Sequence, residues 1–203
     1  MHLRPNKLPH QWLLDVECLR MAGFEAVLAG GCLRDLYCAK QPKDIDIFIL
    51  SKNLFMTDKI KRALGWGAWH EKQYQQFSPV YQIDYVIERS EEGKPPLQII
   101  GVQDVQTPFD LISKFDYGLC QIAFDGAQLL YTQAFERDFL QGTFTLTHAH
   151  AYDRSIERYK SWIEEKYKGW PFVASGIVLR EQLIRSLKGN HGKSSCEISP
   201  LEI

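Results

Sequence analysis

The chain has 203 residues, of which 45% are hydrophobic and 24% are charged, and its formal net charge is −1. These values are typical of a globular protein that is long enough to bury a core, and no overall charge marks a nucleic-acid binder, so contact with RNA or DNA would need a local basic patch. No run of 18 apolar residues is present, so we expect a cytoplasmic protein without a membrane anchor. The five cysteines show no Cys-x-x-Cys spacing and are expected to be reduced.

The first predicted element is an amphipathic helix over residues 8–21, because its apolar residues recur at helical spacing. Gly23 follows in the position of a helix C-cap. A strand over residues 24–29 then leads into a pair of glycines, and a short helix over residues 32–39 stops before Pro42.

Two carboxylates alternate with isoleucines in the strand predicted for residues 44–50. Asp44 and Asp46 are two residues apart, so their side chains point to one face while the isoleucines point into the core. Such a pair repels itself unless a cation lies between, and hard oxygen ligands at this spacing suit Mg²⁺ or Mn²⁺. Gly30 and Gly31 lack a Cβ and allow a bulky anion to approach, and a helix beginning after them would favour a phosphate. The two motifs together predict a site for a metal and a triphosphate.

This region resembles the head domain of the DNA polymerase β nucleotidyltransferase superfamily, and within it the CCA-adding enzymes and bacterial poly(A) polymerases. Their motif reads Gly-Gly-x-x-Arg-Asp and then Asp-x-Asp. The resemblance implies that the first motif contacts the nucleotide, through Gly30, Gly31, Arg34 and Asp35. It also implies that the second motif is catalytic and binds the metal ions, through Asp44 and Asp46. The alternative is a simple glycine turn and a solvated aspartate pair on an edge strand.

Two β-rich segments between residues 81 and 102 flank a polar turn and predict a hairpin. The family usually supplies a third metal-binding carboxylate from the second of these strands, where this chain has Gln98. Two replacements are open, Asp116 and Asp84. Asp116 lies in a strand predicted for residues 114–126, which resembles the family's Arg-Arg-Asp-Phe segment although both arginines are absent. We therefore prefer Asp116 as the third catalytic carboxylate, in a strand that should border the aspartate pair.

The C-terminal part is predicted to be helical. Residues 139–146 resemble the family's link between head and neck, and helices are expected over residues 153–168 and 177–187. Arg154 and Arg158 are four apart and share a helix face. The resemblance implies that they lie over the nucleotide, and the alternative is a pair of solvated arginines.

The expected fold is α/β (α+β), a nucleotidyltransferase head with a small mixed sheet and a short C-terminal helical segment. We divide the chain into a head at residues 1–147, a helical neck-like segment at 148–187 and a flexible tail at 188–203. A weaker metal site combines His148, His150 and Asp153, but two histidines without further His or Cys are a poor zinc signature.

The resemblance implies transfer of a nucleoside monophosphate from an NTP to an acceptor hydroxyl, with two metal ions and release of pyrophosphate. The acceptor stays open between an RNA 3′ end such as that of a tRNA, a protein side chain and a small molecule. The rival interpretation is a catalytically inactive module that binds a nucleotide or RNA, which Gln98 and the missing arginines suggest.

Overall fold

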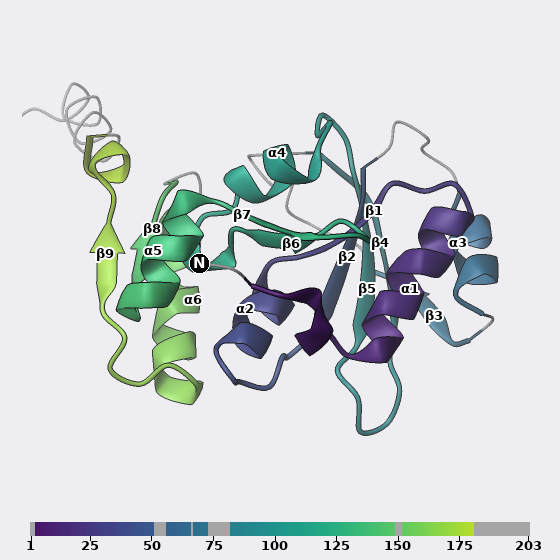
Figure 1. The fold of residues 1–203 in the computed structure, drawn as a ribbon, viewed down its shortest axis with the longest axis horizontal. Coiled ribbons are helices and arrows are strands. Elements are labelled where there is room, and N and C mark those ends of the chain that lie inside the picture. Colours follow the sequence, from purple (N-terminus) through teal and green to yellow (C-terminus); the bar gives the residue numbers. More distant parts are fainter. Residues whose placement is uncertain (1–2, 51–55, 66, 73–81, 149–151, 181–203) are drawn as a thin grey trace, which may run out of the picture.

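The computed structural model describes residues 3–50, 56–65, 67–72, 82–148 and 152–180. Within them, a seven-stranded mixed sheet has the order β3-β4-β5-β2-β1-β6-β7, and β8 pairs with β9 in a second, two-stranded sheet (Figure 1). The strands are β1 (Ala26–Ala29), β2 (Ile45–Leu50), β3 (Trp69–Glu71), β4 (Ile83–Arg89), β5 (Leu97–Val102), β6 (Ile122–Phe124), β7 (Leu129–Tyr131), β8 (Phe144–Leu146) and β9 (Phe172–Ala174). The helices are α1 (His10–Met21), α2 (Gly31–Tyr37), α3 (Thr57–Ala63), α4 (Pro108–Ser113), α5 (Gln133–Gln141) and α6 (Tyr152–Glu165), with 3₁₀ turns at Pro5–Lys7 and Gly118–Cys120.

The large sheet is organised around β2. This strand runs antiparallel to β1 on one side and parallel to β5 on the other, and the β5 pairing sets Asp46 opposite Gln98. The expected hairpin is confirmed, because β4 and β5 pair in antiparallel fashion with Glu88 opposite Gln98. These registers bring side chains from three strands onto one line of the sheet.

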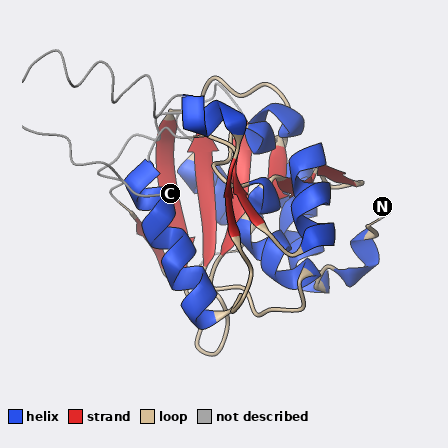
Figure 2. Ribbon diagram, turned by 90° about the vertical axis from the view of Figure 1, so that its left-hand side faces the viewer, coloured by secondary structure: helices blue, strands red, loops and turns tan. Residues whose placement is uncertain are grey.

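Alternation along β2 divides the core between the two faces of the sheet, with helices on both sides (Figure 2). Ile45, Ile47 and Ile49 face a core cluster that includes buried residues of α1, α2 and α3. Phe48 and Leu50 face a smaller cluster with Leu111 and Ile112 of α4. Asp46 shares the second face because it is two residues before Phe48. That face is covered by α4 at one end and accommodates the aspartate at the other.

The strand expected over residues 114–126 is wrong in its first half. Residues 114–117 form no regular strand, a 3₁₀ turn follows, and β6 begins only at Ile122. In addition, β6 borders β1 and not β2, so the predicted contact between the Asp116 segment and the aspartate strand is wrong too. The physical reason is local: the Gln121 side chain donates to the Phe115 carbonyl and Asp116 accepts from the Tyr117 N–H, so these groups are satisfied outside a ladder.

The C-terminal elements gather at one end of the large sheet, as Figure 1 shows for α5, α6, β8 and β9. Phe144 of β8 is fully buried, and its ring lies 5.4 Å from that of Trp162 and 5.0 Å from that of Tyr167. Because β8 pairs with β9, contacts cross the boundary that we expected near residue 147. The division into head and neck therefore stays a prediction. The second expected helix is present over residues 176–180, and the rest of it and the tail lie outside the described residues.

Candidate active site

A glycine turn joins β1 to α2 at one edge of the site. Gly30 has φ = +84°, a conformation that L side chains rarely adopt, and a Cβ there would lie 3.4 Å from the Phe115 ring. Gly31 begins α2, and the Gly30 carbonyl accepts from the Arg34 N–H. Glycine at position 30 thus permits both the turn and the close approach of Phe115.

The two aspartates lie beside each other at the start of β2. Asp46 is partly buried, and burial together with the nearby Asp44 carboxylate raises its pKa to about 7 against the opposing charges of Arg158 and Lys72. Mutual repulsion of this kind is relieved by a divalent cation, so the donor set fits Mg²⁺ or Mn²⁺. Among the residues that the structure describes, however, no group of three or more His, Cys, Asp or Glu side chains is arranged to hold a metal ion.

A cleft of about 630 Å³ lies over this pair, between the sheet and α6. It brings together the residues that the resemblance assigned to nucleotide and metal binding, with Asp116 beside them. Its lining includes Gly30, Gly31, Arg34, Asp35, Asp44, Asp46, Gln98, Asp116, Arg154 and Arg158. Their individual roles in binding and catalysis stay predictions.

Arg34 and Asp35 form a buried ion pair at the base of α6. The Arg34 Nη2 atom lies 2.6 Å from Asp35 Oδ1, and the guanidinium lies over the Trp162 ring, 4.2 Å from its centre. Asp35 also accepts from Lys166 Nζ at 2.7 Å and from the Tyr167 hydroxyl at 2.8 Å. The pair therefore joins α2 to α6 and the residues after it, in addition to lining the cleft.

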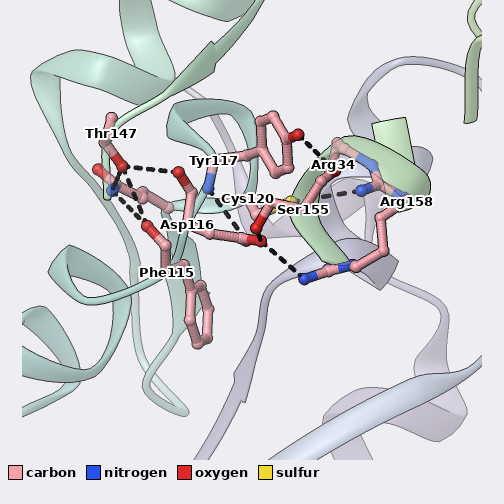
Figure 3. Close-up of polar contacts among 9 residues, drawn as sticks. Arg34, Phe115, Asp116, Tyr117, Cys120, Thr147, Ser155 and Arg158 are labelled. Carbon is pink, nitrogen blue, oxygen red and sulfur yellow. Dashed lines mark hydrogen bonds and ion pairs between the residues drawn. The ribbon is translucent and has the colours of Figure 1, made fainter. Parts of the chain in front are cut away.

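Asp116 is held by α6 (Figure 3). Its Oδ2 atom accepts from Ser155 Oγ at 2.7 Å and from Arg158 Nη1 at 2.9 Å, and its Oδ1 atom accepts from the Tyr117 N–H at 3.1 Å. The Arg158 guanidinium in turn lies over Trp162 at 4.8 Å. Asp116 thus reaches the cleft as a carboxylate that is already paired with a cation.

The two alternatives from the sequence are placed differently. Asp84 accepts a hydrogen bond from Gln103 and is not among the described residues that line the cleft, whereas Asp116 is. For the weaker metal site, His148 Nε2 lies 2.8 Å from a backbone carbonyl, and His150 lies outside the described residues.

Sequence reasoning missed two groups of functional interest. Glu88 accepts from the Gln98 amide at 2.9 Å and pairs with Lys72. Its place follows from strand alternation once the β4–β5 register is known, but the register is not readable from the hairpin sequence alone. Ser155 was also missed, although it precedes Arg158 by one helical turn and therefore shares its face.

Comparisons with known proteins agree with the fold. The model of a family described as "Gabija anti-defense 2 family protein" (Gad2) matches residues 7–142. The structure resembles the Thermotoga maritima CCA-adding enzyme complexed with tRNA (TM-score 0.60, 15% identity) over 91% of this chain and 43% of that one. It also resembles the Bacillus stearothermophilus CCA-adding enzyme in complex with CTP (TM-score 0.59, 11% identity) over 94% of this chain and 46% of that one.

A short sequence match points the same way. Poly(A) polymerase I of Haemophilus influenzae is 44% identical over 45 residues, which are 22% of this chain and 10% of that protein. The expected nucleotidyltransferase head fold is therefore confirmed, and the chain spans less than half the length of these solved enzymes. In the part of the chain that the structure describes, no helix is long and apolar enough to cross a membrane.

Proposed function

The chain belongs to the Gabija anti-defense 2 family, and from this premise and its nucleotidyltransferase fold we propose that it transfers a nucleoside monophosphate from an NTP to an acceptor hydroxyl. The observation that carries the proposal is the Asp44–Asp46 pair, which faces a cleft whose other wall bears Arg154 and Arg158. Carboxylates opposite guanidinium groups suit a metal-bound triphosphate.

In the proposed reaction the acceptor oxygen attacks the α-phosphorus, the bond from that phosphorus to pyrophosphate breaks, and a cleft carboxylate accepts the hydroxyl proton. Asp44 and Asp46 would hold Mg²⁺ or Mn²⁺, which when bound neutralises the phosphates and activates the hydroxyl. The backbone at Gly30 and Gly31, which lines the cleft, is the proposed contact for the phosphates.

The cations of α6 would act on the triphosphate. Arg154 and Arg158 are the proposed phosphate contacts, and the buried Arg34–Asp35 pair keeps α6 in place over the nucleotide. Asp116 is the proposed third catalytic carboxylate, and it would have to exchange its contact with Arg158 for the metal site once the phosphates attract that arginine.

For the acceptor, the family description favours a molecule on which the Gabija defence depends. An RNA 3′ end, a protein side chain and a small molecule all offer a suitable hydroxyl. We therefore propose that transfer to such a component is how members of the family counteract the defence.

The test is incubation of the protein with each α-labelled NTP, Mg²⁺ and an extract of cells that carry the Gabija system. Label should pass to one macromolecule or metabolite, and Asp44→Asn and Asp46→Asn should each reduce transfer by several orders of magnitude, because metal and electrostatic terms dominate this chemistry. Asp58→Asn, an exposed change on α3, is the matched control. Activity above a tenth of wild type in either cleft variant contradicts the proposal.

A second candidate is an inactive module that binds a nucleotide. It is favoured by Gln98, which stands opposite Asp46 where the family has a carboxylate. Calorimetry with NTP and Mg²⁺, run beside a pyrophosphate assay, separates the two functions, since an inactive module takes up the nucleotide and releases no pyrophosphate in any extract.

A further inference from the structure

A line of polar side chains crosses three adjacent strands beside the aspartate pair. Asp46 on β2 is opposite Gln98 on β5, and Gln98 is opposite Glu88 on β4. Residues directly opposite on neighbouring strands share a face, with Cβ atoms about 5 Å apart. Gln98 is therefore an immediate neighbour of the proposed metal ligands, and Glu88 is the next residue outward.

The hydrogen bond between Gln98 and Glu88 fixes the orientation of the amide. The Gln98 Nε2 atom donates to Glu88 Oε2 at 2.9 Å. An ionised carboxylate only accepts hydrogen bonds, so the NH₂ group of Gln98 is the end that faces Glu88. This leaves the carbonyl oxygen, Oε1, as the polar atom that Gln98 offers to the cleft it lines.

Glu88 is suited to hold the Gln98 amide in this orientation because it is ionised at neutral pH. Burial opposes its charge, but hydrogen bonds from Lys72 and Gln98 outweigh that effect and lower its pKa. Lys72 pairs with Glu88, so the negative charge of Glu88 is matched by a side chain of this protein, although the charge of Lys72 also acts on Asp46.

We propose that Glu88 is a positioning residue that presents the Gln98 carbonyl oxygen to the cation held by Asp44 and Asp46. The inference rests on the proposed function, in that it assumes a cation at this pair. Asp46 is itself a hydrogen-bond acceptor. Without Glu88, the amide would turn its NH₂ group toward Asp46, and two N–H dipoles would then point at the cation. With Glu88, a neutral oxygen ligand occupies the position on β5 where this chain lacks a carboxylate, in addition to the contribution proposed for Asp116, as divalent ions with oxygen ligands allow.

The test measures Mn²⁺ binding to the whole protein, without nucleotide, by electron paramagnetic resonance and calorimetry. Glu88→Gln replaces an acceptor that cannot donate with an amide that can do either, so the Gln98 amide is no longer held in one orientation, and Mn²⁺ binding should weaken by up to about tenfold, as is typical when the partner of a metal ligand is altered. Lys72→Met leaves Glu88 and the amide orientation in place, so it should not weaken Mn²⁺ binding.

A swap of the two side chains gives the sharper result. Gln98→Glu combined with Glu88→Gln keeps a hydrogen bond between the positions but moves the carboxylate next to Asp46. This double variant should bind Mn²⁺ more tightly than wild type. The matched control is Gln11→Glu with Asp15→Asn, which reverses a similar amide–carboxylate pair at 3.0 Å on α1 and should leave Mn²⁺ affinity unchanged.

The outcomes separate this inference from the proposed function. If Asp46→Asn binds Mn²⁺ as well as wild type does, no metal site exists at the aspartate pair, and both the proposed function and the positioning role of Glu88 are overturned. If binding depends on Asp46 but stays within twofold of wild type in Glu88→Gln and in the swap, only the positioning role is overturned. A lower melting temperature of metal-free Glu88→Gln with unchanged Mn²⁺ affinity also overturns it, because that result describes a structural contact alone.

Discussion

Arg34 lines the cleft, but its contacts with neighbouring side chains hold two elements of the fold together. Its side chain is only 4% exposed, and its charge is matched by Asp35 under the Trp162 ring. The motif predicts that this arginine contacts the nucleotide, whereas its contacts in the fold join two elements. Loss of Arg34 should therefore lower the free energy of unfolding more than it lowers the affinity for a nucleotide.

We expect Arg34→Ala to lower the free energy of unfolding by about 3–5 kcal/mol, because removing one partner of a buried ion pair leaves the other charge buried. Arg158→Ala should cost less than about 1 kcal/mol, since that side chain is 44% exposed and its partner Asp116 is itself 23% exposed. Urea unfolding of both variants measures the difference. Equal midpoints for Arg34→Ala and wild type would show that the pair contributes no stability.

Asp46 makes the stability of the metal-free protein depend on pH. Its pKa is raised from 3.8 to about 7, so the folded state binds a proton more tightly than the unfolded state. The resulting stability is fully present below about pH 4 and is lost as pH rises through 7. This difference in pKa corresponds to about 4 kcal/mol, so in the presence of a chelator we expect the wild type to lose about 8–16 °C in melting temperature relative to Asp46→Asn between pH 4 and pH 8. If the melting temperatures of the two proteins changed with pH in parallel, the raised pKa of Asp46 would be contradicted.

At the scale of elements, α6 is attached to the rest of the fold through polar contacts as well as aromatic packing. Ser155 is 1% exposed; its hydroxyl donates to Asp116, and its carbonyl accepts from the Tyr117 hydroxyl at 2.6 Å. The helical period of the sequence predicts α6, but it does not reveal that a serine, and not an apolar residue, occupies a fully buried position in its first turn. The Asp116 carboxylate explains that choice.

Ser155→Ala should therefore cost about 1.5–3 kcal/mol, because a part-buried hydrogen bond from a fully buried hydroxyl to a charged group is lost. Ser161→Ala is the matched control, since its hydroxyl donates to Glu165, one turn further along the same helix, in an exposed hydrogen bond. Thermal or urea unfolding compares them. The anchoring role fails if the two variants unfold alike.

At the scale of the whole molecule, the sequence predicted what is local and missed what is distant. The β1–α2–β2 region was correct because its alternation, glycine turn and helix all lie within one short stretch. The same contiguity allowed Asp44 and Asp46 to be assigned to one face. The path of residues 114–117 was not predictable, because Asp116 is satisfied by Ser155 and Arg158, which follow it by 39 and 42 residues.

The candidate site divides in the same way. Its motif residues could be named from the sequence, while the bond between Gln98 and Glu88 depends on a strand register that hydrophobic pattern alone does not fix. The pairing of Asp35 with Lys166, across 131 residues, depends on the assembled fold.

The separation of 131 residues between Asp35 and Lys166 also sets the order in which the two sides of the cleft are synthesised. A chain leaves the ribosome N-terminus first, at about 5–20 residues per second, so roughly 7–26 s separate the synthesis of Asp35 from that of Lys166. During this interval β1 and the aspartate strand β2 can pair within the sheet, but nothing yet covers Arg34 and Asp35 from the side of α6. The newly made protein thus has its carboxylate pair early and the far wall of its cleft late. A nucleotide whose binding depends on α6 could therefore bind only after nearly all of the described chain has been made.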